Sequence, residues 1–366
     1  MRQLPLLEGS LFPGLMGLAL GFSLLQGVAF AHDVQDQRGQ IVHLRNVPAL
    51  RTVFIPMPAP ATYISIDGTD KHIVGMNRSS AEAMQNGILG KIFPGTAAIN
   101  TDIVRGSGFS PNVEAILALH PDVVFQWTNA GSDILESLER AGLPVLGMTY
   151  GSQDNMAGYV AMMGAVAGKP VRATELIERQ KTALKRLSTD LASVSDANRP
   201  RVLYLSGASD HLATVPGTGY MDFMIRTAGG ENVAHDLTGS ASDISFEQIL
   251  AWKPDVILIG NFGTMTPDDL FKDPKWRLIP ATTSKRVYHM PLGGYRWDPP
   301  SQESALTWTW VATLLHPTLI QKNLHEEMRE WYRFLYNHEL SRDEINEILK
   351  TESNSQSADY TRFIAR

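Results

Sequence analysis

A thirteen-residue pattern occurs twice in this chain, 133 positions apart. Residues 112–124 read Asn-Val-Glu-Ala-Ile-Leu-Ala-Leu-His-Pro-Asp-Val-Val, and residues 245–257 read Ser-Phe-Glu-Gln-Ile-Leu-Ala-Trp-Lys-Pro-Asp-Val-Ile. In each copy a glutamate opens a short helix, Ile-Leu-Ala supplies its buried face, and Pro-Asp ends it before a β-branched strand. The repeat predicts two similar lobes, each with a glutamate, Glu114 or Glu247, at the same structural position.

Length and composition narrow the class of protein. A chain of 366 residues with 43% hydrophobic content is long enough for two ordinary domains. The net charge of −6 offers no basic surplus for phosphate contacts, so we expect no nucleic-acid partner. The chain has no cysteine, which excludes disulfides, thiolate metal sites, cysteine nucleophiles and anchoring through a lipidated cysteine.

The N-terminus has the composition of an export signal. Arg2 is the only early positive charge, residues 11–28 are mostly apolar, and residues 29–31 (Ala-Phe-Ala) offer small side chains at the cleavage positions. The apolar stretch is also close to the length of a membrane span, so a retained anchor is the alternative. We predict cleavage after Ala31 and a periplasmic mature protein.

Short apolar strands then alternate with helices, which predicts βα units and mostly parallel sheets. Residues 34–44 predict a hairpin around a Gly-containing turn. Between the two halves, we expect a helix over 155–167 and a second that starts at Pro170 and ends near Ser193. Its roughly 24 residues at about 1.5 Å each predict a rod of about 36 Å, long enough to join two lobes stiffly.

Five regions follow from this pattern. The Ser- and Asn-rich stretch 352–359 is expected to fray. The predicted regions are a signal peptide (1–31), an N-terminal α/β lobe (32–153), a connecting helical region (154–197), a C-terminal α/β lobe (198–317) and a C-terminal helical extension and tail (318–366).

The order of these features resembles the helical-backbone, class III periplasmic binding proteins of ATP-driven (ABC) importers. Besides the two glutamate helices with their Pro-Asp-Val strands, the resemblance rests on the hairpin at 36–39, Gly-Lys-Pro at 168–170 and Gly-Gly-Glu-Asn at 229–232. It covers about residues 34–317. It implies two Rossmann-like lobes joined by one long rigid helix, with a ligand cleft between them.

The resemblance also gives the repeated glutamates a role. In this family one exposed glutamate per lobe docks onto arginines of the permease, and Glu114 and Glu247 match those places. Two carboxylates, one on each lobe, suit a two-fold symmetric partner, here an ABC permease dimer in the inner membrane. The alternative is that each only stabilises its helix N-terminus, by about 0.3–1 kcal/mol. The chain itself is expected to be a monomer.

Ligands of open α/β lobes lie beyond the carboxyl ends of the strands, so side chains that follow strands are the binding candidates. The strongest signal is Tyr295-Arg296-Trp297 after two glycines, because a guanidinium suits an anionic group and the aromatic rings offer flat walls. The alternative pairs Arg296 with Asp298 on the surface and places Trp297 in the core. The other candidates are Met57, Arg78, Arg105, Trp127, Tyr150, Ser206, Asn261 and Phe262.

Direct metal ligation has little support in the sequence. Only His211 and His289 lie near strand ends, and a lone histidine there is more often structural. A site for bare zinc or manganese needs several histidines and carboxylates together. We therefore expect no resident cofactor, and a metal only as part of a ligand.

Catalytic motifs do not support an enzyme. Gly106-Ser107-Gly108 lacks the spacing of a nucleophile elbow, and residues 164–169 are one residue short of a phosphate-binding loop. We expect a solute-binding protein for an iron complex of the ferric siderophore type. The alternatives are molybdate or tungstate, a nickel chelate, haem or cobalamin as cargo, or a binding module that feeds a receptor or sensor.

Overall fold

The computed structural model describes residues 32–106, 108–208, 210–217, 219–238, 242–320 and 322–365. These residues belong to one compact unit. The predicted export signal, residues 1–31, lies outside them. Among the described residues, none of the helices combines the length and apolar character that a membrane span requires.

The N-terminal half is built on a four-stranded parallel sheet, as predicted. Its strand order is β4 (Ile73–Met76), β3 (Thr52–Phe54), β5 (Val123–Trp127) and β6 (Val145–Met148). The predicted hairpin is formed by β1 (His32–Gln35) and β2 (Ile41–Leu44). The helices of this half are α1 (Ala59–Asp67), α2 (Arg78–Asn86), α3 (Leu89–Ile92), α4 (Val113–Ala118), α5 (Ser132–Arg140) and α6 (Gln153–Val166).

Alternate residues of these strands face two different cores. Phe54 and Phe125 stack with ring centroids 4.6 Å apart and belong to the core that includes residues of α1 and α6. Val53 and Val124 point to the other face, where they pack with Ile116 of α4 and residues of α5. Because helices cover both faces, the strands are apolar throughout rather than alternating.

The C-terminal half repeats this plan with antiparallel additions. The strand order is β10 (Ser242–Asp243), β8 (His211–Thr214), β7 (Arg201–Ala208), β11 (Val256–Ile259) and β12 (Val287–His289), and β9 (Glu231–Asn232) also pairs with β7. Strands β7, β9, β11 and β12 run parallel, while β8 and β10 are antiparallel. The helices are α8 (Tyr220–Thr227), α9 (Phe246–Trp252), α10 (Pro267–Lys272), α11 (Pro280–Thr283) and α12 (Ser304–Leu315).

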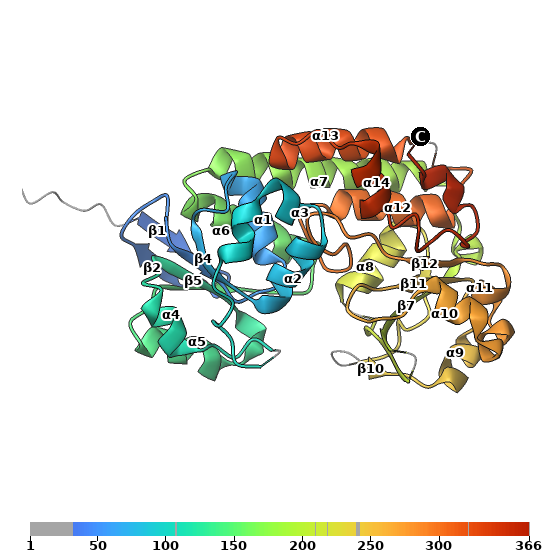
Figure 1. Ribbon diagram of the computed structural model, residues 1–366, viewed down its shortest axis with the longest axis horizontal. Coiled ribbons are helices and arrows are strands. Elements are labelled where there is room, and N and C mark those ends of the chain that lie inside the picture. The colour runs from blue at the N-terminus through green and yellow to red at the C-terminus, as the bar shows by residue number, and fades with distance from the viewer. Residues whose placement is uncertain are drawn as a thin grey trace, which may run out of the picture. The chain divides into compact units, whose positions relative to one another are not determined.

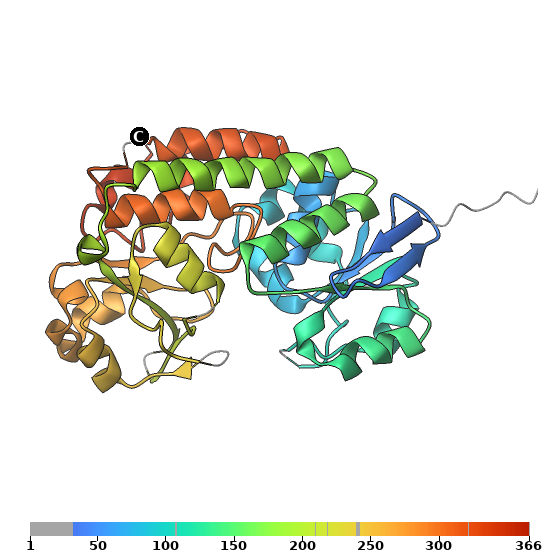
Figure 2. The same cartoon turned by 180° about the vertical axis from the view of Figure 1, so that it is seen from behind.

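One long helix, α7 (Pro170–Asp190), runs along both halves (Figures 1 and 2). It begins at Pro170 as predicted but ends at Asp190, three residues before the predicted end. Helix α13 (Leu324–Tyr336) lies beside it, held by the Arg186–Glu327 ion pair and by the Arg172 guanidinium, which donates to the Phe334 carbonyl. The last helix is α14 (Arg342–Ile348). The C-terminal extension thus doubles the connection between the halves.

The duplicated pattern adopts the same conformation in both copies. Helix α4 leads into β5 and helix α9 leads into β11. His120 and Lys253, which precede the Pro-Asp pair in each copy, both take left-handed backbone conformations, with φ of 45° and 47°. Both helices lie on the same side of their sheets (Figure 1). The predicted equivalence of the two lobes is confirmed.

The repeat extends to an arginine that the sequence comparison did not reveal. The Asp122 carboxylate accepts from the backbone N–H of Arg51, and the Asp255 carboxylate accepts from that of Arg201, both at 2.9 Å. In return each arginine donates its Nε to the carbonyl at the helix end, Leu119 in the first copy and Trp252 in the second. The arginine closes carbonyls that a helix end leaves unpaired. The aspartate of each copy therefore fixes the start of a neighbouring strand.

The expectation that residues 352–359 fray is wrong. Asn354 is fully buried, and its side-chain amide bonds both backbone groups of His289, accepting from N–H at 2.7 Å and donating to C=O at 3.0 Å. The Ser357 hydroxyl donates to the Val287 carbonyl. These polar side chains cover the outer edge of β12, where a further strand would otherwise pair.

Candidate ligand-binding site

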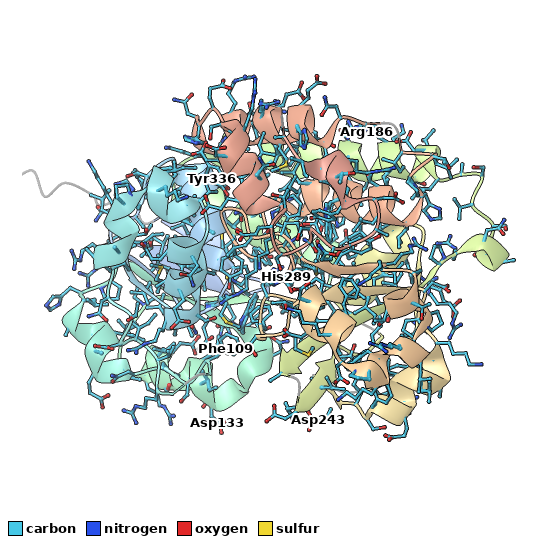
Figure 3. All side chains as sticks on the ribbon, turned by 45° about the vertical axis from the view of Figure 1, so that its right-hand side comes forward. Phe109, Asp133, Arg186, Asp243, His289 and Tyr336 are labelled. Atoms are coloured by element: carbon cyan, nitrogen blue, oxygen red, sulfur yellow. The ribbon has the colours of Figure 1, made fainter. Side chains whose placement is uncertain are left out.

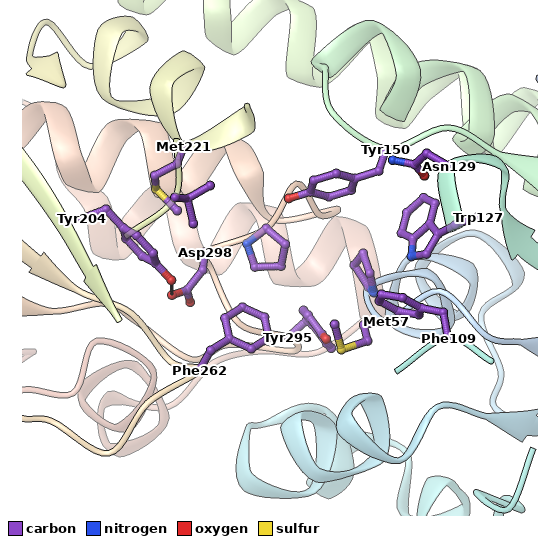
Figure 4. Close-up of a pocket in the computed structure, with 13 residues that line it drawn as sticks. Met57, Phe109, Trp127, Asn129, Tyr150, Tyr204, Met221, Phe262, Tyr295 and Asp298 are labelled. Atoms are coloured by element: carbon purple, nitrogen blue, oxygen red, sulfur yellow. Dashed lines mark hydrogen bonds between the residues drawn. The ribbon is translucent and has the colours of Figure 1, made fainter. Parts of the chain in front are cut away.

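A cavity of about 310 Å³ lies where the carboxyl ends of the two sheets face each other (Figure 4). The strands β3, β5 and β6 end just before lining residues from the N-terminal half, and β11 ends just before Phe262. The lining residues are Met57, Pro58, Phe109, Trp127, Asn129, Tyr150, Tyr204, Val215, Met221, Phe262, Tyr295, Asp298 and Pro299. This location follows the rule for open α/β sheets.

Aromatic rings make up most of the walls. On the N-terminal side, Trp127 packs edge-on against Tyr150 and Phe109, with ring centroids 5.4 and 6.5 Å away. On the C-terminal side stand Phe262, Tyr295 and Tyr204 (Figure 4). Such walls suit a ligand with flat or apolar surface, since each ring contributes a large apolar area at little entropic cost.

Asp298 is the one charged side chain among the described residues that line the cavity. It is almost fully buried, and its Oδ1 accepts from the Tyr204 hydroxyl at 2.9 Å and from the Asn261 N–H at 2.7 Å. Its Oδ2 accepts from the Asn261 side-chain amide at 2.6 Å. The predicted surface alternative, a pair with Arg296, is therefore replaced by neutral donors.

Two tyrosine hydroxyls at the cavity stay protonated. Burial, and then the negative charge of Asp298, raises the pKa of Tyr150 to about 12. Burial also raises the pKa of Tyr295 to about 12, against the opposing effect of Arg296. Tyr150 sits at the rim with 38% of its surface exposed, whereas Tyr295 is buried. At neutral pH both act as neutral hydrogen-bond partners, not as anionic metal ligands.

Arg296 lies behind the wall of the cavity. Its guanidinium stacks over the Phe262 ring at 4.7 Å and donates to the Asn261 carbonyl at 3.3 Å. It also donates to the carbonyl and hydroxyl of Ser79, at 3.0 and 3.2 Å, in the N-terminal half. This arginine therefore links the two halves and supports Phe262, while most of its donors are already engaged.

Trp297 supports the same loop from beneath. It is fully buried, and its Nε1 donates to Glu303 Oε2 at 2.7 Å. The two glycines before Tyr295 are needed because the backbone passes this carboxylate closely. A Cβ on Gly293 would lie 2.0 Å from Glu303 Oε2, and one on Gly294 would lie 2.6 Å from Oε1. The loop is tightly packed at these glycines.

The remaining ligand candidates lie apart from the cavity. Arg78 and Arg105 are exposed and pair with Asp102 at 3.2 Å and with Glu114 at 3.0 Å. The Ser206 hydroxyl donates to a β8 carbonyl within the sheet. Of the predicted ligand residues, the structure brings five together around the cavity: Met57, Trp127, Tyr150, Phe262 and Tyr295. Asn261 reaches it only through Asp298.

Sequence reasoning missed several lining residues. Tyr204 lies inside a strand and Phe109 lies in a loop before α4, whereas the search considered residues directly after strands. Asp298 was considered only as a partner for Arg296. Its place in the same loop as Tyr295, two residues later in an extended stretch, was the available signal that both point the same way.

The two histidine candidates are held by other side chains. His211 is exposed, with Nε2 3.2 Å from Asp243. His289 is half-buried between the Ser353 hydroxyl at 3.0 Å and the Lys350 ammonium at 2.8 Å. Across the described residues, there is no group of three or more histidines and carboxylates that could hold a metal ion.

His289 should make stability depend on pH. Burial, and then the Lys350 charge, lowers the pKa of His289 from 6.5 to about 3. The unfolded chain thus binds this proton below pH 6.5 and the folded chain does not, so stability is lost as the pH falls from 6.5 towards 3, by up to about 1.4 kcal/mol per pH unit. We expect His289→Gln to show a shallower loss of unfolding free energy between pH 6.5 and 4.5 in urea titrations. Parallel curves for the two proteins would contradict this assignment.

The two repeated glutamates are exposed on α4 and α9. The pKa of each is lowered, first by its own backbone N–H and then by Arg105 at Glu114 and by Ser245 at Glu247. Both are therefore ionised at neutral pH. Asp133 and Asp243, which follow α4 and precede α9 in the chain, lie on this same side of the molecule (Figure 3).

Comparison with known proteins shows the family. A family model described as periplasmic binding protein matches residues 68–292, well over half of the chain. The molybdate-binding protein MolA of Haemophilus influenzae is 27% identical over 249 residues, which cover 62% of this chain and 70% of that protein. A cobalamin-binding protein of Halobacterium salinarum is 28% identical over 214 residues, which cover 55% of this chain and 57% of that protein.

Solved structures share the fold. A periplasmic solute-binding protein from Veillonella parvula aligns with a TM-score of 0.80 and 30% identity, covering 88% of this chain and 98% of that one. MolA bound to molybdate aligns with a TM-score of 0.74 and 24% identity over 84% of this chain and 99% of that one, which supports the fold alone. The predicted α/β fold and the prediction of a non-enzymatic protein are confirmed. The chain belongs to the periplasmic binding protein family and is a solute-binding protein of an ABC transporter.

Proposed function

We propose that this chain captures an organic metal complex, with a ferric siderophore as first candidate, and delivers it to an ABC permease dimer in the inner membrane. It is exported after cleavage behind Ala31 and acts as a monomer. The observation that carries the proposal is the cavity itself, in which six aromatic rings surround a single charged side chain, the carboxylate of Asp298. An organic chelator offers the apolar surface that such rings bind.

A bare oxyanion suits this cavity poorly. Molybdate carries two negative charges and needs cations or several free donors to replace its water. The predicted cations do not supply them, because Arg78 and Arg105 pair with acids elsewhere and Arg296 donates to carbonyls behind the wall. The one charge on the lining would repel the anion.

Molybdate is nevertheless the second candidate, because the sequence relationship to MolA favours it. The relationship to the cobalamin-binding protein favours an organic metal complex, as do the haem and nickel-chelate alternatives from the sequence. A receptor or sensor as recipient, in place of a permease, stays a further alternative that the uptake experiment described in the Discussion addresses.

Titration calorimetry on the purified mature protein separates these cargoes. The probes are ferrichrome, cyanocobalamin, haemin, a nickel–histidine complex and sodium molybdate. We expect at least one organic complex to bind and molybdate not to compete with it. Binding of molybdate alone would overturn the proposal.

Trp127→Ala connects the binding to this cavity. Loss of the indole wall removes an aromatic contact, and we expect the affinity for the bound complex to fall about 10- to 100-fold. Trp252→Phe on α9, outside the cavity, is the matched control and should leave the affinity unchanged. Equal affinities of all three proteins would place the ligand elsewhere.

A further inference from the structure

Asp298 has acceptor capacity that the protein does not use. An ionised carboxylate can accept about four hydrogen bonds. Tyr204 and the Asn261 backbone occupy Oδ1, and the Asn261 side chain occupies one position on Oδ2. One acceptor position on Oδ2 is left, on a residue that lines the cavity (Figure 4). The carboxylate can therefore accept one more hydrogen bond, from a ligand.

The carboxylate is held in place before any ligand arrives. The Asn261 amide that binds Asp298 also donates to the Pro291 carbonyl at 3.0 Å, and its oxygen accepts from the Lys350 ammonium. Lys350 and Arg296 lie behind the lining, where their charges offset that of Asp298 while their donors are directed to Asn261 and Ser79. A preorganised acceptor of this kind gains specificity because no reorganisation is needed on binding.

Aromatic faces next to Asp298 suit a positive charge as well. Phe262 already carries one cation, the Arg296 guanidinium, over its ring. Tyr204 and Tyr295 complete the same wall of the cavity. A cation is attracted by the electron-rich face of such rings, and the attraction grows when water is excluded.

We propose that Asp298 selects metal complexes that present a protonated amine, or a cluster of N–H donors, to this aromatic wall. The inference rests on the proposed function and adds the charge of the cargo to it. Complexes of neutral or positive net charge with such a group, as hydroxamate chelators form, are preferred over the strongly anionic complexes that catecholate chelators form.

A matched pair of ferric complexes tests this selection. Ferrioxamine B carries a free ammonium group, and its N-acetylated derivative differs only in lacking that charge. Calorimetry on the wild-type protein is expected to show about tenfold tighter binding of the ammonium form. Asp298→Asn should remove most of this preference. Asp102→Asn, which deletes an equal charge on the outer surface, should keep it.

Each remaining outcome decides the inference. Equal affinity of the two complexes for the wild-type protein overturns it and leaves the proposed function standing. If neither complex binds, the inference is overturned as well, and the wider panel of probes decides separately whether the proposed function falls with it. Should Asp298→Asn fail to fold, Phe262→Leu serves instead, because Phe262 is 46% exposed and its loss should weaken the ammonium form more than the acetylated form.

Discussion

Replacing Glu303 by alanine is expected to lower the free energy of unfolding by about 3–5 kcal/mol. The carboxylate is fully buried and accepts from the Gly294 N–H at 2.9 Å and from the hydroxyls of Tyr332 and Tyr336 at 2.8 and 2.7 Å, besides Trp297. Its removal leaves these donors buried without an acceptor, and each such group costs about 1–3 kcal/mol. Urea denaturation of the two proteins measures the difference.

The matched control for Glu303 is Glu339→Ala. Glu339 is exposed and pairs with Arg333 beyond the end of α13, so its loss should cost about 0.5 kcal/mol or less. If Glu303→Ala does not fold, Tyr336→Phe removes a single donor and should cost about 1 kcal/mol. A loss below about 1 kcal/mol for Glu303→Ala contradicts the account of this carboxylate as the anchor of the 293–297 loop.

Reversing both repeated glutamates, Glu114→Arg with Glu247→Arg, is expected to abolish ATP-driven uptake without changing ligand affinity. The two carboxylates are exposed, ionised and equivalent on α4 and α9, on one side of both sheets (Figure 1). Arginines in their place would repel arginines of a docking partner, while the cavity at the strand ends is untouched. Each single reversal should reduce uptake partially.

Uptake into cells and calorimetry on the purified variant measure the two quantities separately. The control is Glu326→Arg with Glu330→Arg, two exposed glutamates on α13, which lies on the opposite side of the molecule. The control should support normal uptake. Normal uptake by the Glu114 and Glu247 variant would exclude the docking role and leave helix stabilisation, or a recipient other than a permease, as the explanation.

Features that depend on local sequence were predictable. The duplicated pattern gives the two lobes because helix, proline and strand follow one another within thirteen residues. The start of α7 at Pro170 and the strands β4 and β11 follow from proline geometry and short β-branched runs. In each case the physical cause lies within a few residues along the chain.

The site depends on contacts between distant residues, which a local pattern does not contain. The sequence identified the 293–297 loop, but the orientation of Trp297 is set by Glu303 and that of Arg296 by Ser79, 217 residues away. Arg105 looked available for a ligand, while the structure pairs it with Glu114. The buried tail differs for the same reason, because Asn354 bonds a strand edge 65 residues earlier.

The most direct measurement is native mass spectrometry, with metal analysis, of the protein purified from the cells that produce it. The account predicts one bound species per chain, with a mass increment equal to a metal ion plus an organic chelator and a stoichiometric amount of that metal. The increment should disappear in Trp127→Ala, because the indole forms one wall of the cavity. A mass increment equal to a bare oxyanion, retained in Trp127→Ala, would contradict the account.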